Sequence, residues 1–299
     1  EWIVLCPGVV PSLSAVILAL SKANESTVTL PPVYFPFFSA VTKSNRELTL
    51  CPLLYHNHRY EIDFDRLESL NQNTRILLFC SPHNPVSRVW SRSDLEQLIQ
   101  IAEKRNWIII SDEIHADLTY KEYQHLPLAS LSGNAENIIT AMAPSKTFNI
   151  PGLNLSALII PNTSYREAIV RFFDQLHINP VNPFNIVAFE TAYLEGAYWL
   201  DALIDYLTDT RNQVTDYLFH HLPEIKLIKP EGTYLLWLDC QLMNMTDSEL
   251  KRFFVDQAGV GLSPGSLFGE EGSGFMRMNI GTPRSNVITA LDKIKKAYG

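Results

Sequence analysis

Short apolar runs alternate with helical patterns over the first two thirds of the chain. Apolar runs of strand length, typical of strands that are buried on both faces, occupy residues 27–30, 76–79, 108–110, 137–141 and 155–160. Apolar residues at helical spacing (Leu13, Val16, Ile17) and a capping box at residues 93–96 indicate helices between these strands. This alternation predicts a mostly parallel sheet that is covered by helices on both faces.

Strands become sparser toward the C-terminus. The pattern predicts strands at 234–238 and 275–280, and helices over 164–177, 184–207, 247–257 and from 284 onward. Few strands among long helices are typical of a small α+β unit. We therefore predict an α/β protein with a three-layer large domain at residues 1–190 and a smaller α+β C-terminal domain at residues 191–299.

Three polar side chains follow three of the predicted strands. Asn84 follows the run 76–79, Asp112 follows 108–110, and Lys146 follows 137–141. Because open α/β folds bind ligands at the carboxyl edge of the sheet, these side chains are expected to meet there. A lysine with a lowered pKa forms a Schiff base with an aldehyde cofactor, and an aspartate keeps the ring nitrogen of pyridoxal phosphate protonated. Taken alone, however, a Ser-Lys dipeptide is more often solvated surface.

Six sequence motifs lie in an order that resembles a known enzyme family. They read GVVPSLS, PPVYFPF, SPHNPVSRVW, SDEIHADL, APSKTFNIPGLNLS and FMRMNIGTPRS, and they extend over nearly the whole chain. The set resembles fold type I pyridoxal-phosphate enzymes of the class I/II aminotransferase superfamily, and within it looks most like the MalY/PatB branch of cystathionine β-lyases. The resemblance implies an aminotransferase-like large domain, pyridoxal 5′-phosphate as cofactor and an amino acid as substrate.

The resemblance also implies a role for individual residues. Lys146 would hold the cofactor and later remove the substrate α-proton, Asp112 would pair with the ring nitrogen, and Tyr34 would stack on the ring. Arg277 would grip the substrate α-carboxylate with its planar guanidinium. The cofactor-binding residues implied in this way are Gly8, Val9, Val10, Tyr34, Asn84, Asp112, His115, Ser145 and Lys146.

From the residues alone, plainer interpretations stay open at four positions. The turn at Gly8 also fits an ordinary strand-turn-helix, and Tyr34 fits core packing. His115 also fits a hydrogen-bonded core histidine, and Arg277 a solvated arginine on an edge strand.

The activity implied by the resemblance is a carbon–sulfur β-lyase that converts cystathionine-like amino acids into pyruvate, ammonia and a thiol. An aminotransferase with the same site is an alternative, as are a cofactor-binding or regulatory protein without turnover and a degenerate homologue. One scaffold hosts many activities, so the fold does not decide among them.

Several features depart from the family pattern. Ala143 stands where many relatives carry a phosphate-binding serine, and Asn154 stands where they carry an arginine; both suit the lyase branch. Ser87 replaces a glycine, which costs strain if the position needs a positive φ. Relatives carry a substantial segment before Gly8, whereas this chain has seven residues there. A natural truncation, a processed product and a crystallised fragment are all consistent with this. We expect the 299-residue chain to form a homodimer, to bind pyridoxal phosphate weakly and to turn over cystathionine poorly.

The composition and charge of the chain exclude several classes of binding partner. A net charge of −8 argues against nucleic acid and anionic membranes as partners. No apolar run reaches the roughly 20 residues of a membrane span, and residues 1–20 lack the pattern of a signal peptide. The four cysteines lie far apart, as is typical of reduced thiols, and the pair His56 and His58 lacks an evident third metal ligand. The sequence therefore predicts a cytoplasmic protein without a metal site.

Overall fold

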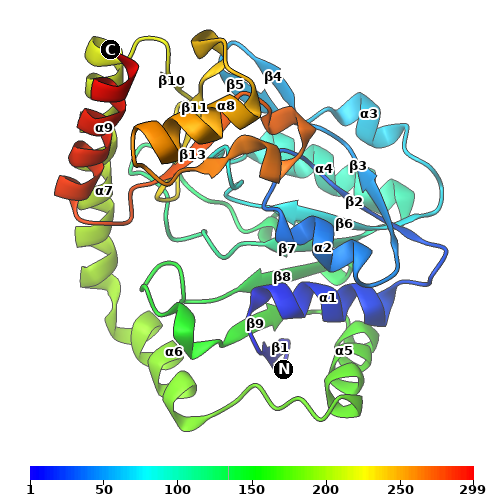
Figure 1. The fold of residues 1–299 in the computed structure, drawn as a ribbon. Helices are drawn as coiled ribbons and strands as arrows, with labels where there is room; N and C mark the ends of the chain where they lie inside the picture. The colour runs from blue at the N-terminus through cyan, green and yellow to red at the C-terminus, as the bar shows by residue number, and fades with distance from the viewer. Residues whose placement is uncertain (134) are drawn as a thin grey trace.

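A seven-stranded sheet forms the centre of the protein (Figure 1). The computed structural model describes residues 1–133 and 135–299. In spatial order the strands are β1 (Ile3–Cys6), β9 (Ser156–Ile159), β8 (Ile138–Met142), β7 (Ile108–Asp112), β6 (Thr74–Cys80), β2 (Ser26–Thr29) and β3 (Glu47–Leu50). From β8 to β3 every pairing is parallel, while β9 runs antiparallel to both β8 and β1. The predicted mostly parallel sheet is confirmed.

Helices cover both faces of this sheet. One face packs against α1 (Val9–Leu20), α2 (Pro36–Thr42) and α5 (Thr163–Gln175), and the other against α3 (Phe64–Glu68) and α4 (Arg92–Arg105). The capping box of α4 joins Ser91 and Asp94, two residues earlier than predicted for its first member. The sheet and its two helical layers form the three-layer arrangement expected from the sequence.

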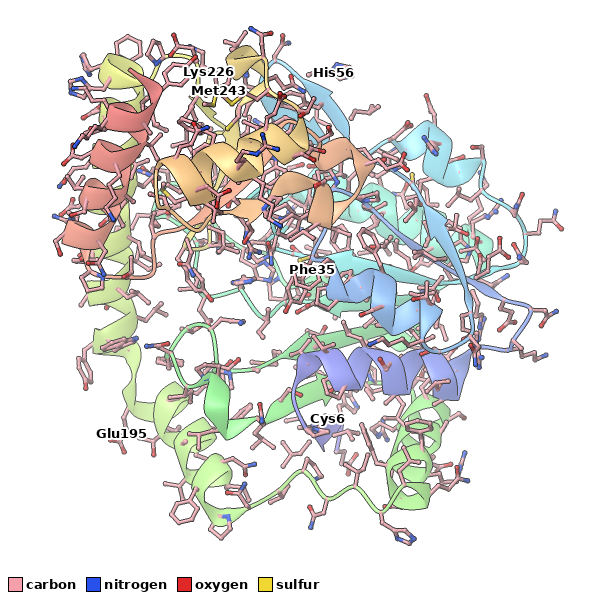
Figure 2. All side chains as sticks on the ribbon, viewed as in Figure 1. Cys6, Phe35, His56, Glu195, Lys226 and Met243 are labelled. Atoms are coloured by element: carbon pink, nitrogen blue, oxygen red, sulfur yellow. The ribbon has the colours of Figure 1, made fainter. Side chains whose placement is uncertain are left out.

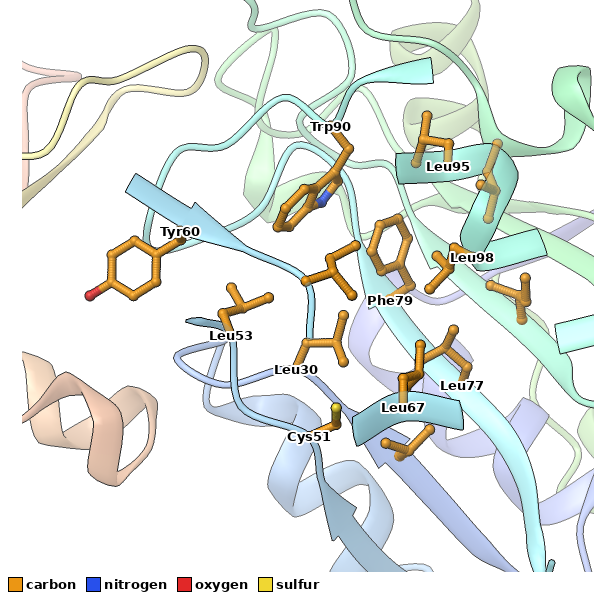
Figure 3. Close-up of a cluster of buried hydrophobic side chains, with 14 of the residues drawn as sticks. Leu30, Cys51, Leu53, Tyr60, Leu67, Leu77, Phe79, Trp90, Leu95 and Leu98 are labelled. Carbon is orange, nitrogen blue, oxygen red and sulfur yellow. The ribbon is translucent and has the colours of Figure 1, made fainter. Parts of the chain in front are cut away.

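Strand β6 shows why these runs are apolar on every residue. Leu77 and Phe79 point into the core beneath α4, where Trp90 and Leu98 also lie (Figure 3). Ile76 and its alternate neighbours point into the opposite core beneath α1. Successive side chains of a strand face opposite sides, so a strand with both faces buried needs apolar residues throughout. Each such side chain contributes about 1.5–3 kcal/mol by leaving water.

A second, four-stranded antiparallel sheet is built from the C-terminal part of the chain. Its order is β10 (Lys226–Leu227), β11 (Leu235–Asp239), β13 (Phe275–Asn279) and β12 (Ser263–Pro264). The helices α7 (Ala197–His221), α8 (Asp247–Arg252) and α9 (Arg284–Tyr298) contribute to the apolar cluster on one side of it. From its other side Trp237 and Phe275 pack into the core beneath α4. The two sheets therefore share buried side chains, and the division at residue 190 stays a prediction.

Two predicted helices differ in their bounds. The helix expected over 184–207 is two helices, α6 (Pro183–Glu195) and α7, and Figure 2 marks Glu195 where they meet. Gly196 lies between them, and a Cβ at this position would overlap the ring of Phe148 and the carbonyl of Ala192, so no larger residue fits there. The helix expected over 247–257 is α-helical only to the end of α8, and a π-helical turn, η5 (Phe253–Gln257), follows.

The segment that carries His56 and His58 is a β-hairpin. His56 ends β4 (Leu54–His56) and His58 stands in the turn before β5 (Arg59–Glu61), with His56 at the outer edge of the molecule (Figure 2). The remaining short elements are 3₁₀ turns: η1 (Leu128–Leu131), η2 (Ala135–Asn137), η3 (Pro151–Leu153), η4 (Gln241–Met243), η6 (Gly265–Phe268) and η7 (Glu270–Gly272). Within the described part of the chain no helix has the length and apolar character to cross a membrane.

Candidate active site

The carboxyl ends of β6, β7 and β8 lie side by side. Cys80 pairs with Asp112, and Asp112 pairs with Ala141 on the next strand. This register brings the loops that follow the three strands to one edge of the sheet, as predicted. A cavity of about 150 Å³ opens there, and eight of the predicted residues line it: Val9, Val10, Tyr34, Asn84, Asp112, His115, Lys146 and Arg277.

Asp112 is a buried carboxylate with few partners. It is the last residue of β7 and is 3% exposed. Its carboxylate accepts a hydrogen bond from the backbone N–H of Ile114, at 3.1 Å. Burial raises the pKa of Asp112 from 3.8 to about 7, and this effect outweighs the opposing hydrogen bond and the charge of Lys146. A cationic group next to this carboxylate would therefore be strongly stabilised.

His115 lies in the same cavity in its neutral form. Burial lowers the pKa of His115 to about 3, and the positive charges of Lys146 and Arg277 lower it further. Its ring packs edge-on against Tyr234 with 5.9 Å between centroids. Its Nδ1 atom is buried and has no hydrogen-bond partner among the described residues. A core histidine with satisfied hydrogen bonds, the plainer interpretation, does not match this environment.

The start of α1 and Tyr34 form another wall. Val9 and Val10 are the first residues of α1, and Gly8 precedes them as its N-cap with φ +95, a conformation that favours glycine. Gly8 itself is outside the residues that line the cavity. Backbone N–H groups at a helix start favour an anion. Burial raises the pKa of Tyr34, and the nearby carboxylate of Asp112 adds to the increase, which keeps the phenol protonated.

Arg277 reaches the cavity from the second sheet. It is on β13, which lies between β11 and β12, so the edge-strand interpretation is wrong. Its Nη1 donates to Asn84 Oδ1 at 3.0 Å and its Nη2 to Ser263 Oγ at 3.4 Å. The guanidinium carbon lies 4.7 Å from the ring centroid of Phe268. The buried Nε atom has no partner among the described residues, so the guanidinium of Arg277 retains an unused N–H donor.

The loop that carries Lys146 is anchored by its neighbour. Thr147 is fully buried; its hydroxyl donates to Asp117 Oδ2 at 3.0 Å, and its carbonyl accepts from the indole N–H of Trp199 at 3.2 Å. These bonds restrict the backbone next to Lys146. Ser145, expected to bind the cofactor, lines a larger cavity on the other side of Lys146 instead of the 150 Å³ cavity.

The loop that carries Asn84 is tied to the C-terminal part of the chain. Arg88 donates to both carboxylate oxygens of Glu231, and the N–H of Val89 donates to the same carboxylate at 2.8 Å. Both charged side chains are about 5% exposed or less. Ser87 has φ +57, so the expected strain at this position is confirmed, and its hydroxyl donates to the carbonyl of Leu235.

Five residues that line the cavity were not predicted from the sequence: Cys80, Ile114, Tyr234, Leu235 and Asn279. Tyr234 and Asn279 line the 150 Å³ cavity together with the predicted set. They flank the second sheet, at the start of β11 and the end of β13. Their only sequence signal is a polar or aromatic residue at the end of an apolar run, which does not distinguish them from ordinary turn residues.

Comparison with known proteins identifies the family. The model of the family described as aminotransferase class I and II matches residues 1–294. The chain therefore belongs to this family.

Particular relatives agree with the resemblance seen in the motifs. The chain is 39% identical to cystathionine beta-lyase PatB of Bacillus subtilis (strain 168), over 99% of this chain and 78% of that protein. It is 33% identical to protein MalY of Escherichia coli (strain K12), over 96% of this chain and 74% of that protein. The crystal structure of cystalysin from Treponema denticola, which contains a pyridoxal 5′-phosphate cofactor, matches with a TM-score of 0.97 and 36% identity, over 99% of this chain and 76% of that chain. The predicted similarity to the MalY/PatB branch is confirmed.

Proposed function

We propose that this protein is a pyridoxal-phosphate-dependent carbon–sulfur β-lyase that acts on cystathionine-like amino acids. The observation that carries the proposal is the cavity in which a lysine, a buried aspartate and a half-buried arginine meet. The similarity to proteins named as cystathionine beta-lyases supports the choice of reaction.

The residues of the cavity fit the cofactor. Asp112 is a carboxylate whose pKa is raised by burial, and a protonated pyridine nitrogen would supply a cation that stabilises its charged form. His115 has a buried Nδ1 without a partner, which suits a polar group of a ligand. The first N–H groups of α1 suit a phosphate.

Each side chain has a separate task in this proposal. Lys146 would hold the cofactor covalently, Tyr34 would cover the ring, and Asp112 would keep a proton on the ring nitrogen. Asn84 and His115 would hydrogen-bond the ring substituents. When bound, the cofactor supplies an electron sink for negative charge at the substrate α-carbon.

Lys146 and Arg277 would act on the substrate. Arg277 would bind the α-carboxylate through its free donors, which orients the Cα–H bond. Lys146 Nζ, once the substrate amine has taken its place on the cofactor, would be free to remove the α-proton as a general base. In the overall reaction the Cα–H and Cβ–S bonds break, a Cα=Cβ bond forms, and the thiolate leaves with the electron pair of the Cβ–S bond. Water then converts the released enamine to pyruvate and ammonia.

A labelling experiment tests the attachment site. Borohydride converts a lysine–aldehyde linkage into a stable amine, so reduction of the cofactor-loaded protein followed by peptide mass mapping should place the pyridoxyl group on Lys146. The matched control is Lys121→Arg, because Lys121 is an exposed lysine that pairs with Asp205 and is absent from the cavity lining. A label on another lysine in the unaltered protein would contradict the assignment.

A product assay tests the reaction. A lyase releases pyruvate, ammonia and thiol from cystathionine without any 2-oxo acid added as amino-group acceptor. An aminotransferase requires such an acceptor for repeated turnover. Turnover that depends on the acceptor, with no thiol released, would favour the aminotransferase.

We further propose that the protein acts as a homodimer in the cytoplasm. Apolar side chains gather in the exposed part of α6 and the start of α7, where Phe184, Leu194 and Tyr198 are 79%, 80% and 78% exposed. Closed two-fold pairing would cover such a surface. Leu194→Asp should therefore lower the mass measured by sedimentation equilibrium, whereas Phe219→Asp, also at an exposed apolar residue but near the far end of α7, should not. The four free, buried cysteines suit a reducing compartment, which cell fractionation would test.

A further inference from the structure

A second cavity, of about 590 Å³, adjoins the one that holds the candidate catalytic groups. The two cavities share Lys146, Tyr234 and Asn279 in their linings. A substrate whose α-carbon lies at Lys146 therefore has continuous space for a side chain to extend into the second cavity. Its volume is within the range of about 300–1,000 Å³ that is common for small-molecule sites.

The walls of this cavity are mainly apolar. Helix α7 contributes Trp199, Leu203 and Leu207, and Ile280 lies in the opposite wall at the end of β13. Among the described residues that line the cavity, Lys146 is the only one with a charged side chain. An ammonium group that entered it would lose hydration without gaining an ion-pair partner, and a carboxylate would meet only Lys146, which the proposed function assigns to the cofactor and the α-carbon.

We propose that this cavity binds the sulfur substituent of the substrate and selects uncharged, apolar substituents over charged ones. The inference rests on the proposed carbon–sulfur lyase activity and specifies its substrate class. Cystathionine ends in a second ammonium and a second carboxylate, whereas an S-alkyl or S-benzyl cysteine places only hydrocarbon against α7. The bonds broken and formed are those of the same β-elimination, and the leaving group is an apolar thiol.

A homologous series of substrates tests the apolar character of the cavity. With the cofactor-loaded protein, kcat/KM for pyruvate release should rise from S-methyl to S-ethyl, S-propyl and S-butyl cysteine. The expected rise is about fourfold per methylene, the fold-change that corresponds to about 0.8 kcal/mol for each buried CH₂. A flat or falling series would overturn the proposal.

An isosteric pair of substrates tests the exclusion of charge. S-propyl cysteine and S-(2-aminoethyl) cysteine differ only in a terminal methyl group against an ammonium. Because Trp199 is 45% exposed and the cavity reaches solvent, we expect a preference of roughly tenfold for the propyl compound. Equal kcat/KM values, or a preference for the ammonium or for cystathionine over S-butyl cysteine, would contradict the proposal.

Variants at one position link the preference to this cavity. Ala202 lies on α7, is exposed and lines the cavity, so a longer side chain there changes the wall without disturbing the core. Ala202→Arg should shift the kcat/KM ratio of S-(2-carboxyethyl) cysteine to S-butyl cysteine about tenfold toward the carboxylate. Ala202→Leu adds bulk without charge and should leave this ratio within about twofold of its original value. Phe219→Arg adds the same charge elsewhere on α7 and should change neither kcat/KM value.

The outcomes separate this inference from the proposed function. Pyruvate release from cystathionine with no gain for apolar substituents leaves the lyase standing and overturns the substrate class. Absence of pyruvate and thiol with every substrate overturns the lyase activity and this inference with it. An unchanged ratio in Ala202→Arg shows that the substituent binds elsewhere, which also overturns the inference.

Discussion

Replacing Asp112 with asparagine should have opposite effects on the cofactor-free protein and on cofactor binding. The substitution keeps the shape of the side chain and removes the charge. Burial raises the pKa of Asp112 from 3.8 to about 7, a difference of about three units. At about 1.36 kcal/mol per pKa unit, ionising the buried carboxylate lowers the free energy of unfolding, and so the stability of the fold, by at most about 4 kcal/mol.

The sign follows from the two pKa values. At a pH below 3.8 the carboxyl is protonated in both the folded and the unfolded chain, so it contributes no pH dependence. Between 3.8 and about 7 the unfolded chain releases the proton and the folded chain keeps it, so stability falls as pH rises. Above about 7 the full cost remains. Asp112→Asn should therefore match the original protein near about pH 4 and become more stable than it by up to about 4 kcal/mol near about pH 8.

Urea unfolding of the cofactor-free proteins, followed by circular dichroism at a series of pH values, measures this difference. All other titrating groups cancel when the variant is compared with the original protein at each pH. Asp256→Asn, at an exposed position on η5, is the matched control and should show no pH-dependent difference. A difference for Asp112→Asn that stays constant with pH, or a variant that is less stable near about pH 8, would refute the reasoning.

Cofactor binding should change in the opposite direction. A protonated ring nitrogen beside Asp112 would offset the cost of its ionisation, and an amide cannot replace that ion pair. The loss of one charged hydrogen bond, about 1.5–3 kcal/mol, corresponds to roughly 10- to 100-fold weaker binding. Titration of the cofactor-free protein with pyridoxal phosphate, monitored by its visible absorbance, measures this. Unchanged affinity would show that Asp112 does not face the ring nitrogen.

Three further substitutions have definite expected outcomes. Arg277→Lys should keep the cofactor absorbance but lower kcat/KM roughly 10- to 100-fold through KM, because an ammonium lacks the planar fork; normal steady-state kinetics would contradict the assignment. Glu231→Gln should cost about 3–5 kcal/mol in urea unfolding because it leaves Arg88 buried without its ion pair, whereas Glu122→Gln, at a carboxylate that is 55% exposed in its pair with Arg211, should cost below about 1 kcal/mol; equal costs would show that burial is not decisive. Thr147→Val should affect kcat more strongly than the free energy of unfolding, because it removes the hydrogen bond to Asp117 that holds the loop of Lys146. A loss of stability with a normal kcat would show that Thr147 has only a structural role.

The sequence was most informative where local pattern and strand topology coincide. The runs that became β6, β7 and β8 are mainly apolar, and parallel strands place their carboxyl ends together, so Asn84, Asp112 and Lys146 were expected to meet. The motif resemblance added Arg277, which comes from a separate sheet. No local pattern predicts that contact, because it depends on how the two sheets pack.

The errors came from features that local pattern does not encode. A helix over 184–207 was predicted because one glycine in an apolar stretch is a weak break signal; the ring of Phe148, from another part of the chain, leaves no room for a side chain at Gly196. The hairpin around His58 lacks a glycine, and its turn uses Asn57 and His58 at positive φ instead. The larger cavity beside Lys146 was not predicted at all, since its walls come from four separate stretches of the chain.

The electrostatics of the site also explain why its groups are unusual for a core. Three groups of the site each lower the stability of the cofactor-free fold. They are the Asp112 carboxylate with a pKa near about 7, the neutral His115 ring with an unpaired Nδ1 atom, and the desolvated Arg277 guanidinium. Buried groups of this kind gain most from a ligand that carries complementary charges. The low local dielectric constant that makes an unpaired charge costly also strengthens its attraction to an opposite charge. A ligand that binds only the folded state then adds stability that grows with its concentration. Pyridoxal phosphate should therefore raise the unfolding temperature of the original protein much more than that of Asp112→Asn, which connects the cost of the site directly to the cofactor it is proposed to hold.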